Sequence, residues 1–276
     1  MEKIIIETTT IDGIPILTLK KENLENGPII FYLHGFTSDK RQGFSFGYEL
    51  AKKGFYFVAL DAKMHGERFD PKLEKVLSGK ADLIYPLGSG LDGGLLMYEI
   101  ILQTGKDIDL LIAHFKAMGA VHADAIGLAG YSMGGYAAFF IAAHNSNIQT
   151  VVPIAGIPAF EARWKDVVLE ASTYPEWSKQ MEAVRNETES RTRLIEEIDP
   201  FEKLVHFYPK PLLVLCGDTD TDSPKKYSVD LYRKLKPVYQ AYPDRLQLRI
   251  YDEVGHQLAP PMIQDACDWF DQFLLR

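Results

Sequence analysis

The chain has 276 residues, of which 46% are hydrophobic and 25% are charged. This balance is typical of a folded globular protein and excludes a disordered or fibrous chain. Acidic residues outnumber basic ones by 38 to 30, which gives a formal net charge of -8. Nucleic acids and anionic membranes both attract basic surfaces, so neither is an expected partner. The sequence does not indicate the oligomeric state.

The two cysteines, Cys216 and Cys267, have neither the spacing of a zinc site nor that of a disulfide scaffold, so we expect free thiols and no bound metal. The N-terminus, Met1-Glu2-Lys3 followed by three isoleucines, lacks the apolar stretch of a secretory signal peptide. We therefore expect a cytoplasmic protein. A chain of this length can bury a large core, and we expect one domain over residues 1–276.

The first expected elements are strands at residues 4–10 and 14–19, which flank a turn at Asp12-Gly13 and predict an antiparallel hairpin at a sheet edge. Five later runs are almost continuously apolar, as is typical of strands buried on both faces of a parallel sheet. A further strand, at 246–251, alternates apolar and polar residues and is expected near the far edge. The five continuous runs are 29–33, 56–60, 125–129, 151–155 and 212–216.

Helical patterns lie between these strands. Apolar residues between Ile108 and Phe115 recur at i, i+3, i+4 and i+7, Gly119 is a natural stop, and a final helix is expected to start at Pro260-Pro261. Alternating strands and helices predict an α/β fold with a mostly parallel, doubly wound sheet of about eight strands.

Two segments are too long for simple connections. Residues 63–94 contain Gly88-Ser89-Gly90-Leu91-Asp92-Gly93, a G-x-G-x-x-G pattern without the preceding strand of a dinucleotide site, which we interpret as a loop. Residues 157–210 are helical in pattern, and we predict that they form a lid inserted into the domain. Their aromatic residues Trp164, Tyr174 and Trp177 either line a substrate pocket or dock the lid to the body.

The sharpest motif is Gly130-Tyr131-Ser132-Met133-Gly134, a complete G-x-S-x-G. The apolar run 125–129 precedes it, and an apolar helical segment, 135–143, follows it. A serine on such a strand-to-helix turn is exposed as a nucleophile, and the flanking glycines remove Cβ atoms that would clash there. We therefore predict that Ser132 is a catalytic nucleophile.

A serine needs a general base and an orienting acid, which in sheets of this type follow it in the order acid, then histidine. His256 has the expected position for the base, because it follows the strand 246–251 and precedes the last helix. The chain's earlier histidines, among them His34 and His65, come too early for this order or lie on helices.

Three carboxylates, Asp218, Asp220 and Asp222, follow the strand 212–216 and are candidates for the acid. Their spacing is also that of the first residues of an EF-hand calcium-binding loop. Positions six and twelve of that loop would be Ser223 and Val229 instead of the required glycine and glutamate, which excludes a calcium site of this type. We choose Asp220, because an acid one turn beyond the strand can reach the histidine loop.

An acyl-transfer site also needs two backbone N–H groups for the developing oxyanion. One is expected from Met133, directly after the nucleophile. The other is expected from Phe36, in the sequence His34-Gly35-Phe36 that follows the strand 29–33.

Together these motifs resemble the α/β-hydrolase superfamily over nearly the whole chain. The segments His34-Gly35-Phe36-Thr37-Ser38 and Asp61-Ala62-x-x-His65-Gly66-x-Arg68-Phe69 are similar to small bacterial esterases of the dienelactone-hydrolase and prolyl-oligopeptidase-like branch. In that family the acid usually stands three residues after the strand-end glycine, which supports Asp220. Ser223 stands where the family often has valine. The resemblance implies hydrolysis of a carboxylic ester and no cofactor.

The expected function is therefore that of a serine hydrolase acting on a small ester of short to medium acyl or aryl type. A peptidase or aminopeptidase, a thioesterase or an acyltransferase would use the same residues. A catalytically silent binding module is the alternative from another class. We interpret Asp61 as a turn cap and His65 as a residue that shapes the following loop, not as catalytic groups.

Overall fold

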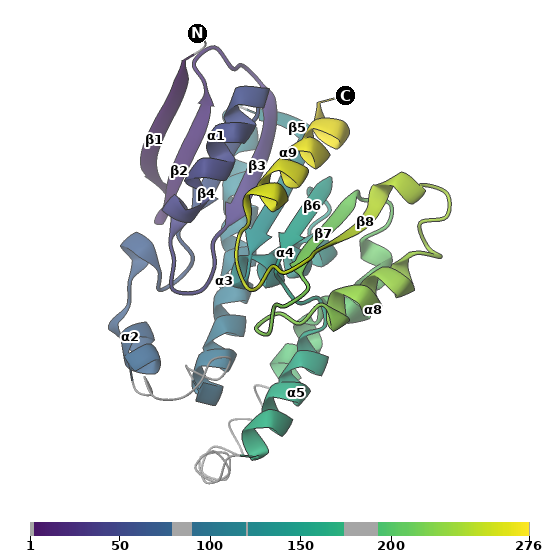
Figure 1. Cartoon of the computed structure of the whole chain (residues 1–276). Coiled ribbons are helices and arrows are strands. Elements are labelled where there is room, and N and C mark those ends of the chain that lie inside the picture. The colour runs from purple at the N-terminus through teal and green to yellow at the C-terminus, as the bar shows by residue number, and fades with distance from the viewer. Residues whose placement is uncertain (1–2, 79–89, 120, 174–192, 276) are drawn as a thin grey trace.

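The computed structural model describes residues 3–78, 90–119, 121–173 and 193–275. At its centre is an eight-stranded sheet with the order β1-β2-β4-β3-β5-β6-β7-β8 (Figure 1). β1 and β2 form the predicted edge hairpin, β2 is antiparallel to β4, and all other neighbours are parallel, which confirms the predicted sheet. The strands are β1 (Ile4–Ile11), β2 (Ile14–Lys21), β3 (Gly27–Leu33), β4 (Tyr56–Leu60), β5 (Val121–Tyr131), β6 (Thr150–Ile154), β7 (Leu212–Gly217) and β8 (Leu246–Tyr251).

Helices cover both faces of the sheet (Figure 1). α1 and α9 pack on one face, and α3, α4 and α8 pack on the other. One apolar core lies between the sheet and each of these two helix layers. α5 follows β6, and α2 precedes α3. The helices are α1 (Phe44–Lys53), α2 (Pro71–Ser78), α3 (Gly90–Ala117), α4 (Met133–His144), α5 (Phe160–Ser172), α8 (Lys226–Leu235) and α9 (Pro260–Leu274).

The central strand β3 shows why the strands are continuously apolar. Ile29, Phe31 and Leu33 contribute to the core under α3 and α4, whereas Ile30 and Tyr32 contribute to the core under α1 and α9. All five side chains are at most 3% exposed. A strand with helices on both faces therefore has no polar side.

α3 differs from the expectation. The loop interpretation of residues 88–93 is wrong for residues 90–93, which form the first turn of α3, while residues 88 and 89 lie outside the described part. Further along this helix Tyr98, Ile100 and Ile101 are fully buried in the core. Packing of this face stabilises a helix that extends into a glycine-rich start, so tertiary contacts override the low helix propensity of glycine.

The segment 157–210 is described at both of its ends. α5 begins it, and a 3-10 helix, Pro200–His206, lies near its end. Phe160 and Trp164 of α5 are buried in the same core as the sheet. Residues 174–192, including Tyr174 and Trp177, lie outside the described residues. A single domain with a lid at 157–210 stays a prediction.

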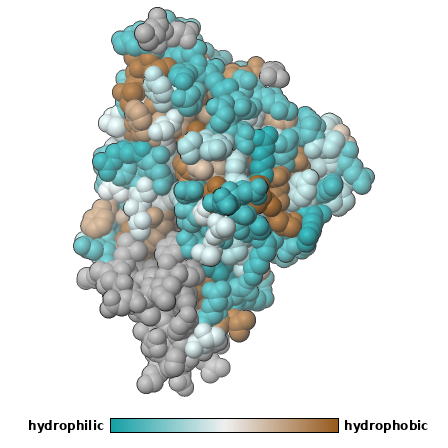
Figure 2. All heavy atoms as spheres, viewed as in Figure 1, coloured by the Kyte–Doolittle hydropathy of each residue, from teal (hydrophilic) through white to brown (hydrophobic). Residues whose placement is uncertain are grey.

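The outer face that carries α1 and α9 is mostly hydrophilic, with small separate apolar areas (Figure 2). This agrees with the inward packing of the apolar helix faces. Of the helices in the described residues, none combines the length and the apolar character that a bilayer crossing requires.

Candidate active site

Ser132 lies at the sharp turn between β5 and α4, with a backbone φ of 55°. The turn brings backbones so close that a Cβ atom on Gly130 would lie 2.0 Å from the carbonyl oxygen of Gly134, and one on Gly134 would lie 2.0 Å from that of Leu33. The Ser132 N–H donates to the carbonyl of Ile154 at 2.9 Å. Only glycine fits the two flanking positions, which is why the motif needs them.

His256 lies against this serine. Its Nε2 is 2.8 Å from Ser132 Oγ, and its Nδ1 is 2.9 Å from Asp220 Oδ2. A carboxylate only accepts hydrogen bonds, so Nδ1 carries the proton and Nε2 is left with the lone pair that accepts the serine hydroxyl. The arrangement can therefore remove a proton from the serine.

Asp220 is held by its own loop. Its Oδ1 accepts the backbone N–H groups of Asp222 at 2.9 Å and Ser223 at 2.8 Å, and its side chain is fully buried. Asp218 is held differently from Asp220. Its backbone N–H donates to the carbonyl of Tyr251, and its buried Oδ1 has no hydrogen-bond partner within the described residues. Burial raises the pKa of the nearby Asp222 carboxyl. Among the three candidate acids, the structure places Asp220 against His256.

Backbone contacts between two loops bring Asp220 and His256 together. A Cβ atom on Gly217 would lie 2.0 Å from the carbonyl oxygen of Val254, so the histidine loop rests directly on the end of β7. The Thr219 N–H donates to the same carbonyl at 3.2 Å. Tyr131, the residue before the nucleophile, also holds the histidine loop, because its hydroxyl donates to the carbonyl of His256 at 2.9 Å.

The two expected oxyanion donors lie in suitable backbone positions. Met133 is the first residue of α4, where N–H groups have no partner within the helix and the helix dipole favours negative charge. Phe36 lies between two anchored amides, because the Gly35 N–H donates to Gln42 Oε1 at 2.8 Å and the Thr37 N–H donates to His65 Nε2 at 3.3 Å. Within the described residues, nothing accepts a hydrogen bond from the Phe36 N–H.

Sequence reasoning missed a charge cluster beside the Phe36 loop, in which Lys40 and Asp61 are buried and Glu67 is exposed. Lys40 Nζ lies 2.6 Å from both Asp61 Oδ2 and Glu67 Oε1, and the Lys40 side chain is only 6% exposed. Asp61 also accepts the backbone N–H groups of Lys40 and Glu67 at 2.9 Å, so it caps the turn as predicted. No sequence pattern indicates this cluster, because its members come from segments more than 20 residues apart.

Asp220, Asp222 and His256 each place one possible metal-ligand atom within 4.8 Å of the others. However, Asp220 and His256 already share a hydrogen bond, and the other Asp220 oxygen accepts two amides. These bonds explain the proximity of the three residues without a cation. The absence of a metal or cofactor stays a prediction.

The predicted pocket residues are only partly described. Trp164 is 3% exposed and packs in the core with Phe160 and Ile195, which is consistent with docking α5 to the body. Its role in a pocket, like the roles of Tyr174 and Trp177 outside the described residues, stays a prediction.

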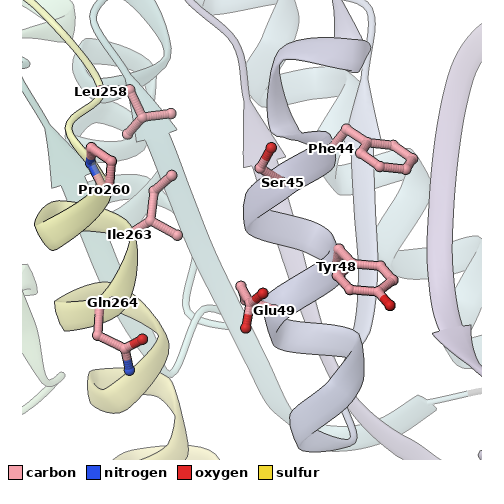
Figure 3. Close-up of a pocket in the computed structure, with 8 residues that line it drawn as sticks. All are labelled: Phe44, Ser45, Tyr48, Glu49, Leu258, Pro260, Ile263 and Gln264. Atoms are coloured by element: carbon pink, nitrogen blue, oxygen red, sulfur yellow. The ribbon is translucent and has the colours of Figure 1, made fainter. Parts of the chain in front are cut away.

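A separate groove of about 610 Å³ lies between α1 and α9, the two helices that cover one face of the sheet (Figure 3). Leu258, two residues after His256, is part of its wall, but Ser132, Asp220 and His256 are not. The groove is therefore distinct from the serine site. Its lining residues are Phe44, Ser45, Tyr48, Glu49, Leu258, Pro260, Ile263 and Gln264.

The buried His34 makes the stability of the fold depend on pH. Its Nδ1 donates to the carbonyl of Gly35 at 2.8 Å, and its Nε2 accepts the N–H of Ala62 at 3.0 Å. The bond from Ala62 needs the neutral ring, because a protonated imidazole has no lone pair on Nε2. Burial lowers the pKa of His34 to about 4. Its contribution to stability is complete above the unfolded pKa of about 6.5 and is lost as the pH falls toward 4, by up to about 3 kcal/mol.

We expect this loss to appear in urea unfolding measured at pH 7 and pH 4.5, with a lower free energy of unfolding at pH 4.5. His34→Gln, which keeps an acceptor but does not titrate, should show a shallower dependence on pH. Equal slopes for the two proteins would contradict the assignment to His34.

The fold is shared with solved structures. TT1662 from Thermus thermophilus superposes with a TM-score of 0.70 at 18% identity, covering 99% of both chains. Acetyl xylan esterase from Paenibacillus sp. R4 superposes with a TM-score of 0.64 at 15% identity, covering 99% of this chain and 90% of that one. These similarities show the fold alone, and they confirm the predicted α/β-hydrolase architecture.

Sequence comparison extends the similarity over the whole chain. The Bacillus subtilis (strain 168) protein named "Putative esterase YitV" is 26% identical over 271 residues, covering 98% of this chain and 99% of the relative. The sequence profile described as prolyl oligopeptidase family matches residues 102–275, more than half of the chain. That stretch runs from α3 to α9 and includes the serine, aspartate and histidine that the fold brings together. The chain therefore belongs to the prolyl oligopeptidase family.

Proposed function

We propose that the chain is a serine hydrolase that cleaves small carboxylic esters through an acyl-enzyme. The observation that carries the proposal is the continuous hydrogen-bond path from Ser132 Oγ through His256 to Asp220, with bonds of 2.8 and 2.9 Å. Three side chains bonded in this order, with the serine on a strained turn at the end of a buried strand, form the constellation of a serine nucleophile with its base and orienting acid.

In the first half-reaction Ser132 Oγ attacks the ester carbonyl carbon while His256 Nε2 takes the hydroxyl proton. The carbonyl oxygen becomes an oxyanion that the N–H groups of Phe36 and Met133 stabilise. The carbon–oxygen bond to the alcohol then breaks, and His256 gives its proton to the leaving oxygen. In the second half-reaction water, activated by His256, releases the acid from Ser132. Asp220 keeps the ring in the tautomer that this cycle requires.

An ester is the favoured substrate because the relative that matches the chain from end to end is named as an esterase. The family description points to a second candidate, a peptidase that uses the same triad. Both reactions begin with the same acylation, so the scissile bond has to be determined by assay. Transfer to an added alcohol or thiol would instead identify an acyltransferase.

The test is a series of p-nitrophenyl esters of increasing acyl length beside aminoacyl p-nitroanilides. We expect turnover of the esters with a maximum of kcat/KM at short to medium acyl chains, and no turnover of the anilides. Anilide cleavage with kcat/KM equal to that of the esters would favour the peptidase. A lack of turnover of every ester would contradict the proposed function.

A further inference from the structure

The Phe36 loop contains a backbone conformation that needs support from outside the loop. Thr37, directly after the expected oxyanion donor, has a φ of 68°. A β-branched residue rarely adopts this left-handed region, and such strain persists only where the surroundings hold it. The Thr37 N–H donates to the Nε2 atom of His65 at 3.3 Å, on a segment 28 residues away.

His65 is built to be an acceptor at that atom. Its Nδ1 lies 2.8 Å from the carbonyl oxygen of Lys63, and a carbonyl only accepts, so Nδ1 carries the proton. In the neutral ring this leaves the lone pair on Nε2, facing Thr37. The side chain is 2% exposed, and burial lowers the pKa of His65, so the neutral ring persists at neutral pH.

The position of His65 is itself fixed. Its ring packs against those of His34, at 5.1 Å between centroids, and Phe36, at 5.4 Å. The turn that carries it is closed by Asp61, whose carboxylate is so near that a Cβ atom on the following Gly66 would lie 2.3 Å from it. Lys40 pairs with the same carboxylate.

We propose that His65 is a positioning residue for the oxyanion hole: its Nε2 holds the Thr37 N–H, and thereby aims the neighbouring Phe36 N–H at the substrate oxygen. This role rests on the proposed function, because it matters only if an oxyanion forms there. It deepens that function by giving a histidine outside the triad a part in stabilising the transition state.

The test compares His65→Phe, which keeps an aromatic ring but has no acceptor, with His65→Gln, whose carbonyl can take the place of Nε2. An oxyanion donor acts in the transition state and not on the bound substrate. We therefore expect His65→Phe to lower kcat for p-nitrophenyl butyrate by about 10²-fold, within the range found for loss of one donor, with little change in KM. His65→Gln should stay within about 10-fold of wild type.

A merely structural role predicts a different result, namely that both variants lose folded protein and activity together. Thermal unfolding of each variant measures the first loss, and kcat is referred to the folded fraction. Equal losses of kcat in the two variants, or full kcat in His65→Phe, would overturn the proposal.

Hydrogen exchange provides a readout that does not depend on catalysis. The Thr37 amide should exchange slowly in wild type and in His65→Gln, and faster in His65→Phe. If wild type hydrolyses no ester, the proposed function fails, and the exchange data still decide whether His65 holds the loop. Unchanged exchange in His65→Phe would overturn that part by itself.

Discussion

Replacing Ser132 with alanine should lower kcat for ester hydrolysis on the order of 10⁶-fold, the loss found when the nucleophile of such a triad is removed. The hydroxyl is the group that forms the covalent bond, and among the described residues no other hydroxyl is hydrogen-bonded to the imidazole of His256. The residual rate should reflect only binding and the oxyanion donors. Initial rates with p-nitrophenyl butyrate measure the effect.

The matched control is Ser45→Ala, which removes an exposed serine in the groove between α1 and α9 and should leave kcat unchanged. A fluorophosphonate probe provides a second readout, because it should label wild type and Ser45→Ala but not Ser132→Ala. Equal ester turnover in Ser132→Ala and wild type would refute the esterase mechanism. A wild-type protein that the probe does not label would indicate the non-catalytic binding module.

Asp220→Asn should lower kcat by about 10⁴-fold, as the same change does in serine hydrolases with this triad. The carboxylate accepts the proton of His256 Nδ1, whereas the amide group can donate to Nδ1 and so favours the tautomer with the proton on Nε2. That tautomer cannot take a proton from Ser132. Single-turnover and steady-state rates should fall together, because acylation itself is impaired.

Asp218→Asn is the control for this loop, since both nitrogens of the His256 imidazole are hydrogen-bonded to other residues, Asp220 and Ser132. We expect its kcat to lie within about 10-fold of wild type, in the range of a change that leaves the triad intact. Asp222→Asn should also keep most of the activity. A larger loss at Asp222 than at Asp220 would identify Asp222 as the orienting acid.

Much of the fold follows from local patterns. Burial on both faces leaves a continuous apolar run, so the strand containing Ile29 and Phe31 is visible without any knowledge of its partners. The turn at Ser132 is also visible from a five-residue motif. Gly130 is required by a close approach within that motif, to Gly134, whereas Gly134 is required by the backbone of Leu33 on a neighbouring strand. The start of α3 could not be predicted, because it depends on packing of Ile100 and Ile101 against distant strands.

The site shows the same limit. Chain order and spacing lead to three aspartates near the correct position, but the choice among them depends on how the Gly217 end of β7 rests on Val254. The contacts of Lys40 with Asp61 and of Thr37 with His65 join segments that no motif relates. Sequence patterns indicate which groups carry the chemistry, whereas the groups that hold them in place become visible only with the coordinates.

The wide separation of Ser132 from His256 along the chain, 124 residues, has a consequence for synthesis. During translation the nucleophile and its whole strand leave the ribosome well before the imidazole that must activate them. A nascent or prematurely terminated polypeptide therefore contains a serine without its base. Under the proposed mechanism, ester cleavage therefore requires a chain that has been made at least through His256.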